Sequence, residues 1–166
     1  EERAVTTSQE PFEDAISRTL EQLQSSTAQI EVESTQLLGN GVIADVIVTN
    51  LAGHKFPSGF PSRRTWIHVK LEDANGSTLF ESGGFSDDGR IMGNANDEDP
   101  AQFEPHYDAI VQPDQVQIYE AILRDTQSEV TTRLLRAAAY MKDNRLIPLG
   151  FEKGAPIEDI AVRGRA

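Results

Sequence analysis

The stretch Asn50-Leu-Ala-Gly-His-Lys-Phe-Pro-Ser-Gly-Phe-Pro-Ser-Arg-Arg-Thr-Trp66 lies between residues 41–49 and 65–72, whose β-branched or alternating residues predict β-strands. Two glycines and two prolines punctuate it, and these residue types impose special backbone angles. A loop of defined shape, held at both ends by a sheet, is therefore predicted. We call residues 50–66 the basic loop, because it gathers His54, Lys55, Arg63 and Arg64. Loops on a rigid scaffold often carry function, so this loop is the first candidate site.

The composition describes an acidic globular chain. Its 166 residues allow one well-buried core, and 38% hydrophobic with 25% charged residues are typical of a soluble protein. A formal net charge of −12 argues against nucleic acid and anionic membranes as partners, and it suits a basic partner or divalent cations. No apolar run is long enough to span a bilayer, so we expect no membrane insertion. The lack of cysteine excludes disulfides, thiolate metal sites and covalently attached haem.

The first part of the chain predicts one helix followed by hairpins. Apolar residues at helical spacing predict an amphipathic helix over residues 8–24, with Ser8 as its cap. A period of two then predicts a hairpin over residues 28–49 and a second hairpin over residues 65–82. In the second hairpin, residues 65–72 are expected to form one continuous strand.

The second part alternates irregular and regular segments. Residues 83–112 have no regular pattern and many acidic and asparagine side chains, so they are predicted to form an ordered functional loop, the acidic loop. Residues 115–123 predict a strand. Residues 130–141 predict a strand that passes into a short helical turn, and residues 142–145 a polar turn.

These elements together predict a mainly β fold. Two successive hairpins favour an antiparallel, immunoglobulin-like β-sandwich with an N-terminal helix and long irregular loops. In this prediction residues 1–27 are a helical connector and residues 28–166 form the sandwich domain.

Several segments occur in an order that has a parallel in a known family. They are the motif Gly53-His-Lys-Phe-Pro-Ser-Gly-Phe-Pro-Ser-Arg-Arg64, the residues Thr65-Trp-Ile-His-Val69 after it, and the segments at residues 94–100, 103–107, 117–121 and 142–151. Over about residues 28–162 the chain resembles the cysteine-free β-sandwich companion domain of multihaem c-type cytochromes. The order of these motifs is more specific than any one of them.

The resemblance implies a non-catalytic companion domain that shields or contacts haem and supports electron transfer or assembly. Because the chain has no cysteine, the haem c would belong to a haem-bearing segment of the same parent protein or to a redox partner. The resemblance also implies a periplasmic or extracellular location.

Two histidines are candidate contacts of such a haem. His54 is the first candidate for an axial ligand, and His106 is the second. The alternative for His54 is a hydrogen bond that braces the basic loop. Lys55 adds a positive charge beside His54.

Three further residues of the basic loop have both a cofactor and a structural interpretation. Arg63 and Arg64 suit either bidentate hydrogen bonds to haem propionates or pairing with the acidic loop. Trp66 suits either the edge of a cofactor or the core beside a sheet.

The acidic loop is a candidate calcium site, because hard oxygen ligands at short spacing suit Ca²⁺. Simple solvation of the charged loop is the alternative. The candidate ligands are Asp88, Asn94, Asn96, Asp97 and Asp99.

Two functions of other classes remain open on sequence grounds. One is a calcium-stabilised extracellular binding module, for example for carbohydrate, that uses Trp66, Phe56 or Phe60 as an aromatic platform. The other is a hydrolase built on His54, His106 and Asp108, which requires those side chains within hydrogen-bond reach.

Overall fold

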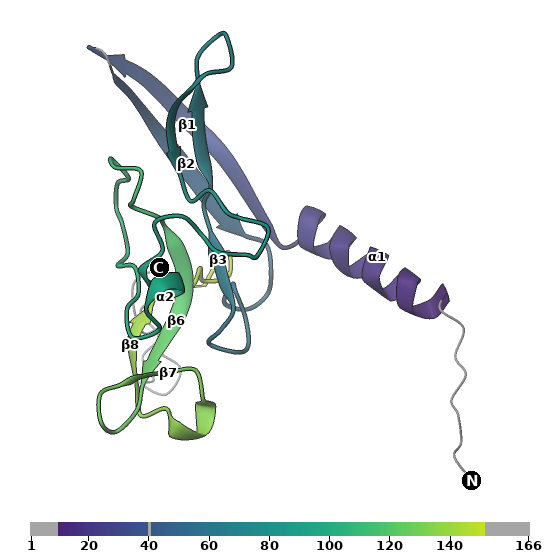
Figure 1. Cartoon of the computed structure of the whole chain (residues 1–166). Helices are drawn as coiled ribbons and strands as arrows, with labels where there is room; N and C mark the ends of the chain where they lie inside the picture. Colours follow the sequence, from purple (N-terminus) through teal and green to yellow (C-terminus); the bar gives the residue numbers. More distant parts are fainter. Residues whose placement is uncertain (1–9, 40, 152–166) are drawn as a thin grey trace. The chain divides into compact units, whose positions relative to one another are not determined.

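The computed structural model of the chain describes residues 10–39 and 41–151 (Figure 1). The chain is mainly β, as predicted, with few helical residues. It forms two compact units, and its sequence passes from the first to the second between His54 and Lys55. The described part of unit 1 consists of residues 10–39, 41–54 and 148–150, and that of unit 2 of residues 55–147 and 151. The predicted domains, residues 1–27 and 28–166, divide the chain differently and stay a prediction.

Unit 1 begins with the predicted helix, α1, which spans Glu10–Ser25. The predicted cap, Ser8, lies outside the described residues. The hydroxyl of Thr27 donates to the carbonyl of Gln22 at 2.9 Å and so adds a second hydrogen bond to the one that this carbonyl accepts from the N–H of Ser26 at the helix end. None of the residues of α1 is buried. In residues 10–39 and 41–151, no helix has both the length and the apolar character needed to cross a membrane.

The predicted first hairpin follows α1. Strand β1, Ala28–Leu38, pairs antiparallel with β2, Gly41–Asn50, along its whole length, with an irregularity between Val32 and Ser34. Gly39 has a φ of 64°, a left-handed conformation that suits glycine in the tight turn between the strands. Figure 1 shows the two strands as one long ribbon pair, with α1 leading away from its base.

Unit 2 is organised around β6, Ile118–Arg124. β6 pairs with β3, Arg64–Trp66, with β7, Val130–Thr131, and with β8, Ala139–Asp143. All these pairings are antiparallel. Most of β6 is buried, which is why its residues are apolar on both faces except where a polar side chain finds a buried partner.

The prediction of one strand over residues 65–72 is wrong. The chain breaks after β3 and begins a new strand, β4, at Val69–Glu72, which pairs with β5, Thr78–Ser82, in a separate sheet. The break follows from tertiary contacts. The backbone N–H of Ile67 donates to the carbonyl of Gln117, and the indole of Trp66 donates to the carbonyl of Gly83.

The core of unit 2 joins distant segments of sequence. Ile91, Val116 and Ile118 are almost completely buried, and Trp66 packs against them. Because Ile91 belongs to the acidic loop, this packing orders the loop around one short helix, α2, at Ala95–Glu98. The prediction of an ordered acidic loop is therefore confirmed for the described residues.

The last part of unit 2 corrects a second prediction. After β7 the chain makes a short 3-10 turn, η1, at Leu134–Arg136, in agreement with the predicted strand and helical turn. It then re-enters the sheet as β8, so the predicted polar turn at residues 142–145 is wrong. Lys142, Asp143 and Asn144 are all buried. Each has a charged or amide partner inside the fold, which is the physical condition for burying such groups.

Candidate functional site

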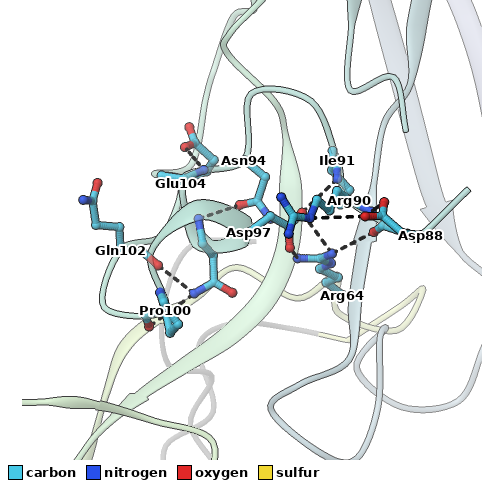
Figure 2. Close-up of polar contacts among 12 residues, drawn as sticks. Arg64, Asp88, Arg90, Ile91, Asn94, Asp97, Pro100, Gln102 and Glu104 are labelled. Carbon is cyan, nitrogen blue, oxygen red and sulfur yellow. Dashed lines mark hydrogen bonds and ion pairs between the residues drawn. The ribbon is translucent and has the colours of Figure 1, made fainter. Parts of the chain in front are cut away.

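The first group of candidate residues joins the basic loop to the acidic loop (Figure 2). The guanidinium of Arg64 donates to both carboxylate oxygens of Asp97, at 2.6 and 3.1 Å, and to the carbonyl of Gly89 at 3.2 Å. Asp97 also accepts the backbone N–H of Ile91 at 2.8 Å. Burial by itself would raise the pKa of the Asp97 carboxyl, but the hydrogen bonds from Arg64 and Ile91 hold it below its ordinary value. Arg64 therefore has the structural role that the sequence left open.

Asn94 lies at the centre of this group. Its side-chain oxygen caps α2 by accepting the N–H of Asn96 at 3.3 Å. Its amide nitrogen is buried and makes no hydrogen bond of good geometry, but it lies toward the Asp97 carboxylate and helps to lower its pKa. The backbone N–H of Ala95 donates to the buried carboxylate of Glu104.

The other candidate calcium ligands are engaged in local contacts. Asp88 accepts the hydroxyl of Ser86 and lies 3.3 Å from the Arg90 guanidinium. Asp99 accepts the N–H of Ala101 and the side-chain amide of Gln102, while Asn96 donates to the carbonyl of Gln102. Within the described parts of the chain, no group of three or more histidine or acidic side chains could hold a metal ion. The calcium site stays a prediction without structural support.

A second group surrounds the buried carboxylate of Asp143. Lys55 donates to it at 2.7 Å, and Arg145 donates to both of its oxygens, at 2.8 and 2.9 Å. Burial alone would raise the pKa of this carboxyl, but hydrogen bonds from Arg145 and Lys55 lower it. Lys55, expected beside a cofactor, thus forms an ion pair within unit 2.

His106 is held by two side-chain amides. Gln117 and Asn144 both place an amide nitrogen near its Nδ1, at 2.8 and 3.1 Å. Both amides have a fixed orientation, because the oxygen of Gln117 accepts the N–H of Tyr107 and the oxygen of Asn144 accepts the N–H of Glu120. Nδ1 is therefore the acceptor, and the neutral ring carries its proton on Nε2.

This tautomer bears on two proposed roles of His106. Its Nε2 lies 3.8 Å from the exposed carboxylate of Asp108. The lone pair of Nδ1 is already shared between two donors, and Nε2 carries the proton of the neutral ring. In this tautomer neither nitrogen offers a lone pair to a haem iron or to the proton of a nucleophile. The contact with Asp108 therefore gives the hydrolase hypothesis no support, and His106 fits poorly as an axial ligand.

Buried charged groups lie next to the residues that hold His106, since Asn144 also accepts the N–H of Glu120. The ammonium of Lys142 donates to Glu120 at 2.8 Å and to the carbonyl of Ile118 at 3.0 Å. Burial lowers the pKa of Lys142, and the Glu120 carboxylate opposes that effect. Tyr107 donates its hydroxyl to Glu104 at 2.7 Å, and burial together with this bond raises the pKa of Tyr107 to about 12.

Sequence reasoning missed this buried network. The residues concerned are charged or amide side chains, which are expected at the surface. No local pattern indicates their buried partners, which for Lys142 and Asn144 lie more than twenty positions away. The missed residues are Glu104, Gln117, Glu120, Lys142, Asp143 and Asn144.

The remaining residues of the basic loop differ in exposure. In unit 1, Asn50 is buried and donates to the carbonyl of His54 at 2.7 Å, while its oxygen accepts the N–H of Ala52 at 2.9 Å. The backbone of His54 is thereby braced, and the residue itself is exposed. In unit 2, Phe60 is 60% exposed and Arg63 is exposed, with one hydrogen bond from Arg63 to the carbonyl of Ser58.

Two aromatic residues of the basic loop are partly buried in unit 2. Phe56 pairs with Leu146 through two backbone hydrogen bonds of 2.9 Å. Trp66 packs on the core, as the structural alternative for this residue predicted. Neither the family models, nor the curated proteins, nor the solved structures compared with this chain gave a match.

Proposed function

We propose that the chain is a non-catalytic companion domain of a multihaem c-type cytochrome. In this role it docks on a haem-bearing segment of its parent protein or on a redox partner, limits solvent access to the haem and supports electron transfer or assembly. The proposal includes a periplasmic or extracellular location and an immunoglobulin-like arrangement of the sheets. It is supported by the resemblance of the basic loop to the corresponding motif of that family and by the hydrogen bonds that hold the backbone of this loop.

The observation that carries the proposal is the bracing of an exposed histidine. The side chain of Asn50 is buried and fixes the backbone on both sides of the turn, through Ala52 and His54. The N–H of Leu51 adds a hydrogen bond to the carbonyl of Thr27 at 3.0 Å. A defined backbone that carries an exposed imidazole suits a ligand offered to a cofactor that another segment holds.

Only some of the candidate residues of this chain are suited to contact a haem. The absence of cysteine excludes covalent attachment of haem c to this chain. A haem attached elsewhere supplies the redox chemistry, and His54 would supply an imidazole nitrogen to its iron. Arg64 and Lys55 are committed to Asp97 and Asp143, so we do not assign them to haem propionates.

An absorbance titration of the full chain with haem tests the proposal. We expect a Soret shift typical of imidazole ligation that is lost in His54→Ala. The matched control is His68→Ala, because His68 is also exposed but pairs with Glu81 at 2.8 Å. A shift that survives in His54→Ala, or one that disappears equally in both variants, would contradict a haem-ligating role of the basic loop.

The exposure of Phe60 favours one alternative, a carbohydrate-binding module. An exposed aromatic ring on a shaped loop is a suitable platform for a sugar ring. In this case Phe60→Ala should abolish binding on a glycan array, whereas substitution of the half-buried Phe56 should mainly reduce stability. If the unsubstituted chain binds no glycan, the carbohydrate-binding alternative is excluded. A melting temperature that does not change on addition of calcium would exclude stabilisation of this module by calcium.

A further inference from the structure

The β1–β2 hairpin of unit 1 has one predominantly apolar face. Directly paired residues of an antiparallel hairpin share a face, and successive pairs alternate between the two faces. The register therefore places one set of aliphatic side chains together. The set, here called the aliphatic face, consists of Ile30, Val32, Leu37, Val42, Ala44, Val46 and Val48, and Thr35, the partner of Ala44, lies on the same face.

The opposite face is mixed. Its pairs place Glu31 beside Ile47, Ser34 beside Asp45 and Gln36 beside Ile43. The two faces therefore differ in polarity, a pattern typical of antiparallel sheets that bury one side.

The described part of unit 1 does not cover the aliphatic face. Leu37 is 86% exposed, Val32 60% and Ile30 59%. Among the described residues of unit 1, only Thr27 and Asn50 are buried. A two-stranded hairpin is marginally stable by itself, and a contiguous apolar patch of this kind marks a contact surface.

The charge of unit 1 indicates the chemistry of the partner. Its described residues hold seven acidic side chains and one basic side chain, Arg18, which gives a net charge of −6 with neutral histidine. Three of the acids, Glu31, Glu33 and Asp45, lie on the hairpin itself. A second copy of the chain would bring the same negative charge to the interface, which costs free energy.

We propose that the aliphatic face binds a protein surface that is aliphatic at its centre and lined by lysine and arginine. The centre of such a surface removes the valine, isoleucine and leucine side chains from water, and its rim complements the acidic surroundings. The inference rests on the docking role proposed above, but it requires neither haem ligation nor His54.

The test uses the full chain and a labelled peptide of alternating leucine and lysine as the probe. A peptide of alternating leucine and glutamate is the charge control. The variant is Val46→Asn, and the matched control is Ile47→Asn, because Val46 and Ile47 are 38% and 39% exposed on opposite faces of the same strand. Fluorescence anisotropy measures the binding, and circular dichroism checks that each variant is folded.

The expected result is binding of the lysine peptide that weakens at least tenfold in Val46→Asn, is retained in Ile47→Asn and declines with added salt. Val46→Thr, which keeps the shape and the strand preference, should give a smaller loss in the same direction if the asparagine variant fails to fold. Equal loss in both asparagine variants, or equal binding of the glutamate peptide, would overturn the proposal.

Two further measurements separate the other possible occupants. Light scattering that shows a dimer, and a monomer for Val46→Asn, would identify a second copy as the occupant and overturn the proposal. Strong hydrogen-exchange protection of β1 and β2 in the monomer, unchanged by the lysine peptide, would show that the chain covers its own face and would also overturn it. These results are independent of the haem titration, so a failure of either proposal can be recognised separately.

Discussion

The ammonium of Lys55 lies 2.7 Å from the buried carboxylate of Asp143, a residue 88 positions further along the chain. Arg145 binds the same carboxylate through two hydrogen bonds. One carboxylate therefore holds the beginning of unit 2 to the end of β8. The sequence suggested Lys55 as a residue near a cofactor, but in the structure its ammonium stabilises the fold.

Replacing Asp143 with asparagine should destabilise the chain by about 3 kcal/mol, because two partly buried cations lose their counter-charge. Unfolding in urea, followed by circular dichroism, measures the change. The matched control is Asp87→Asn on the exposed surface of the acidic loop, which should alter the free energy of unfolding by less than about 0.5 kcal/mol. Equal effects of the two substitutions would contradict the assigned role of Asp143.

The same carboxylate should make stability depend on pH. Its pKa in the folded chain is below the value of about 3.9 expected for an unfolded aspartate. Its stabilising contribution is therefore complete above the unfolded pKa and is lost as the pH falls through the folded pKa. The difference in unfolding free energy between the parent chain and Asp143→Asn should narrow as the pH falls below about 4. A difference that stays constant over this range would show that the pKa is not lowered.

The two arginines of the basic loop should differ in their effect on stability. Arg64→Ala removes a bidentate ion pair with Asp97 and a bond to Gly89, so it should cost about 2 kcal/mol. Arg63→Ala removes one exposed bond to a carbonyl and should cost less than about 1 kcal/mol. Thermal unfolding of both variants tests this order, and a larger loss for Arg63→Ala would refute it.

The neutral imidazole of His106 should carry its proton on Nε2, because two amide donors lie at Nδ1. Nitrogen NMR of the imidazole distinguishes this tautomer from the Nδ1–H form. Asn144→Ala leaves the buried N–H of Glu120 without its partner and removes one of the two side-chain donors to the carbonyl of Ile118, so it should cost about 2 kcal/mol. Gln112→Ala, on the exposed loop before β6, is the control and should have little effect.

Two glycines with positive φ should respond very differently to alanine. At Gly83, with a φ of 71°, an added Cβ would collide with the carbonyl of Ile67 and crowd Trp66 and Val116, so Gly83→Ala should cost more than about 3 kcal/mol. At Gly76, with a φ of 82°, the Cβ would enter open space, and only the backbone strain of about 1 kcal/mol remains. Similar melting temperatures for the two variants would show that the contact between Gly83 and Ile67 is relaxed.

Elements with a local cause were predictable from the sequence. The helix and the first hairpin have clear periods of 3.6 and 2, and both occur close to their predicted bounds. The continuous strand over residues 65–72 was wrong, because a break caused by the contacts of Trp66 and Ile67 with Gly83 and Gln117 leaves no local signal.

In the candidate site, too, the residues could be identified from the sequence, but their contacts could not. The sequence identified Arg64 and Asp97 separately and offered their pairing as one of two alternatives, but only the fold brings the two side chains together. It gave no indication that Lys142 and Asn144 are buried, because their burial depends on partners 22 to 26 positions away.

The sequence by itself determined the mainly β class, the acidic charge, the exclusion of covalent haem by the lack of cysteine and the alternating pattern of the first hairpin. Periodicity and composition are sufficient for these properties, since each depends on residues close in the chain or on a sum over all of them. The tertiary structure decided which charged groups become internal ion pairs and which stay at the surface. That outcome depends on the energy of burying a charge, which is favourable only where a partner from a distant segment arrives at hydrogen-bond distance.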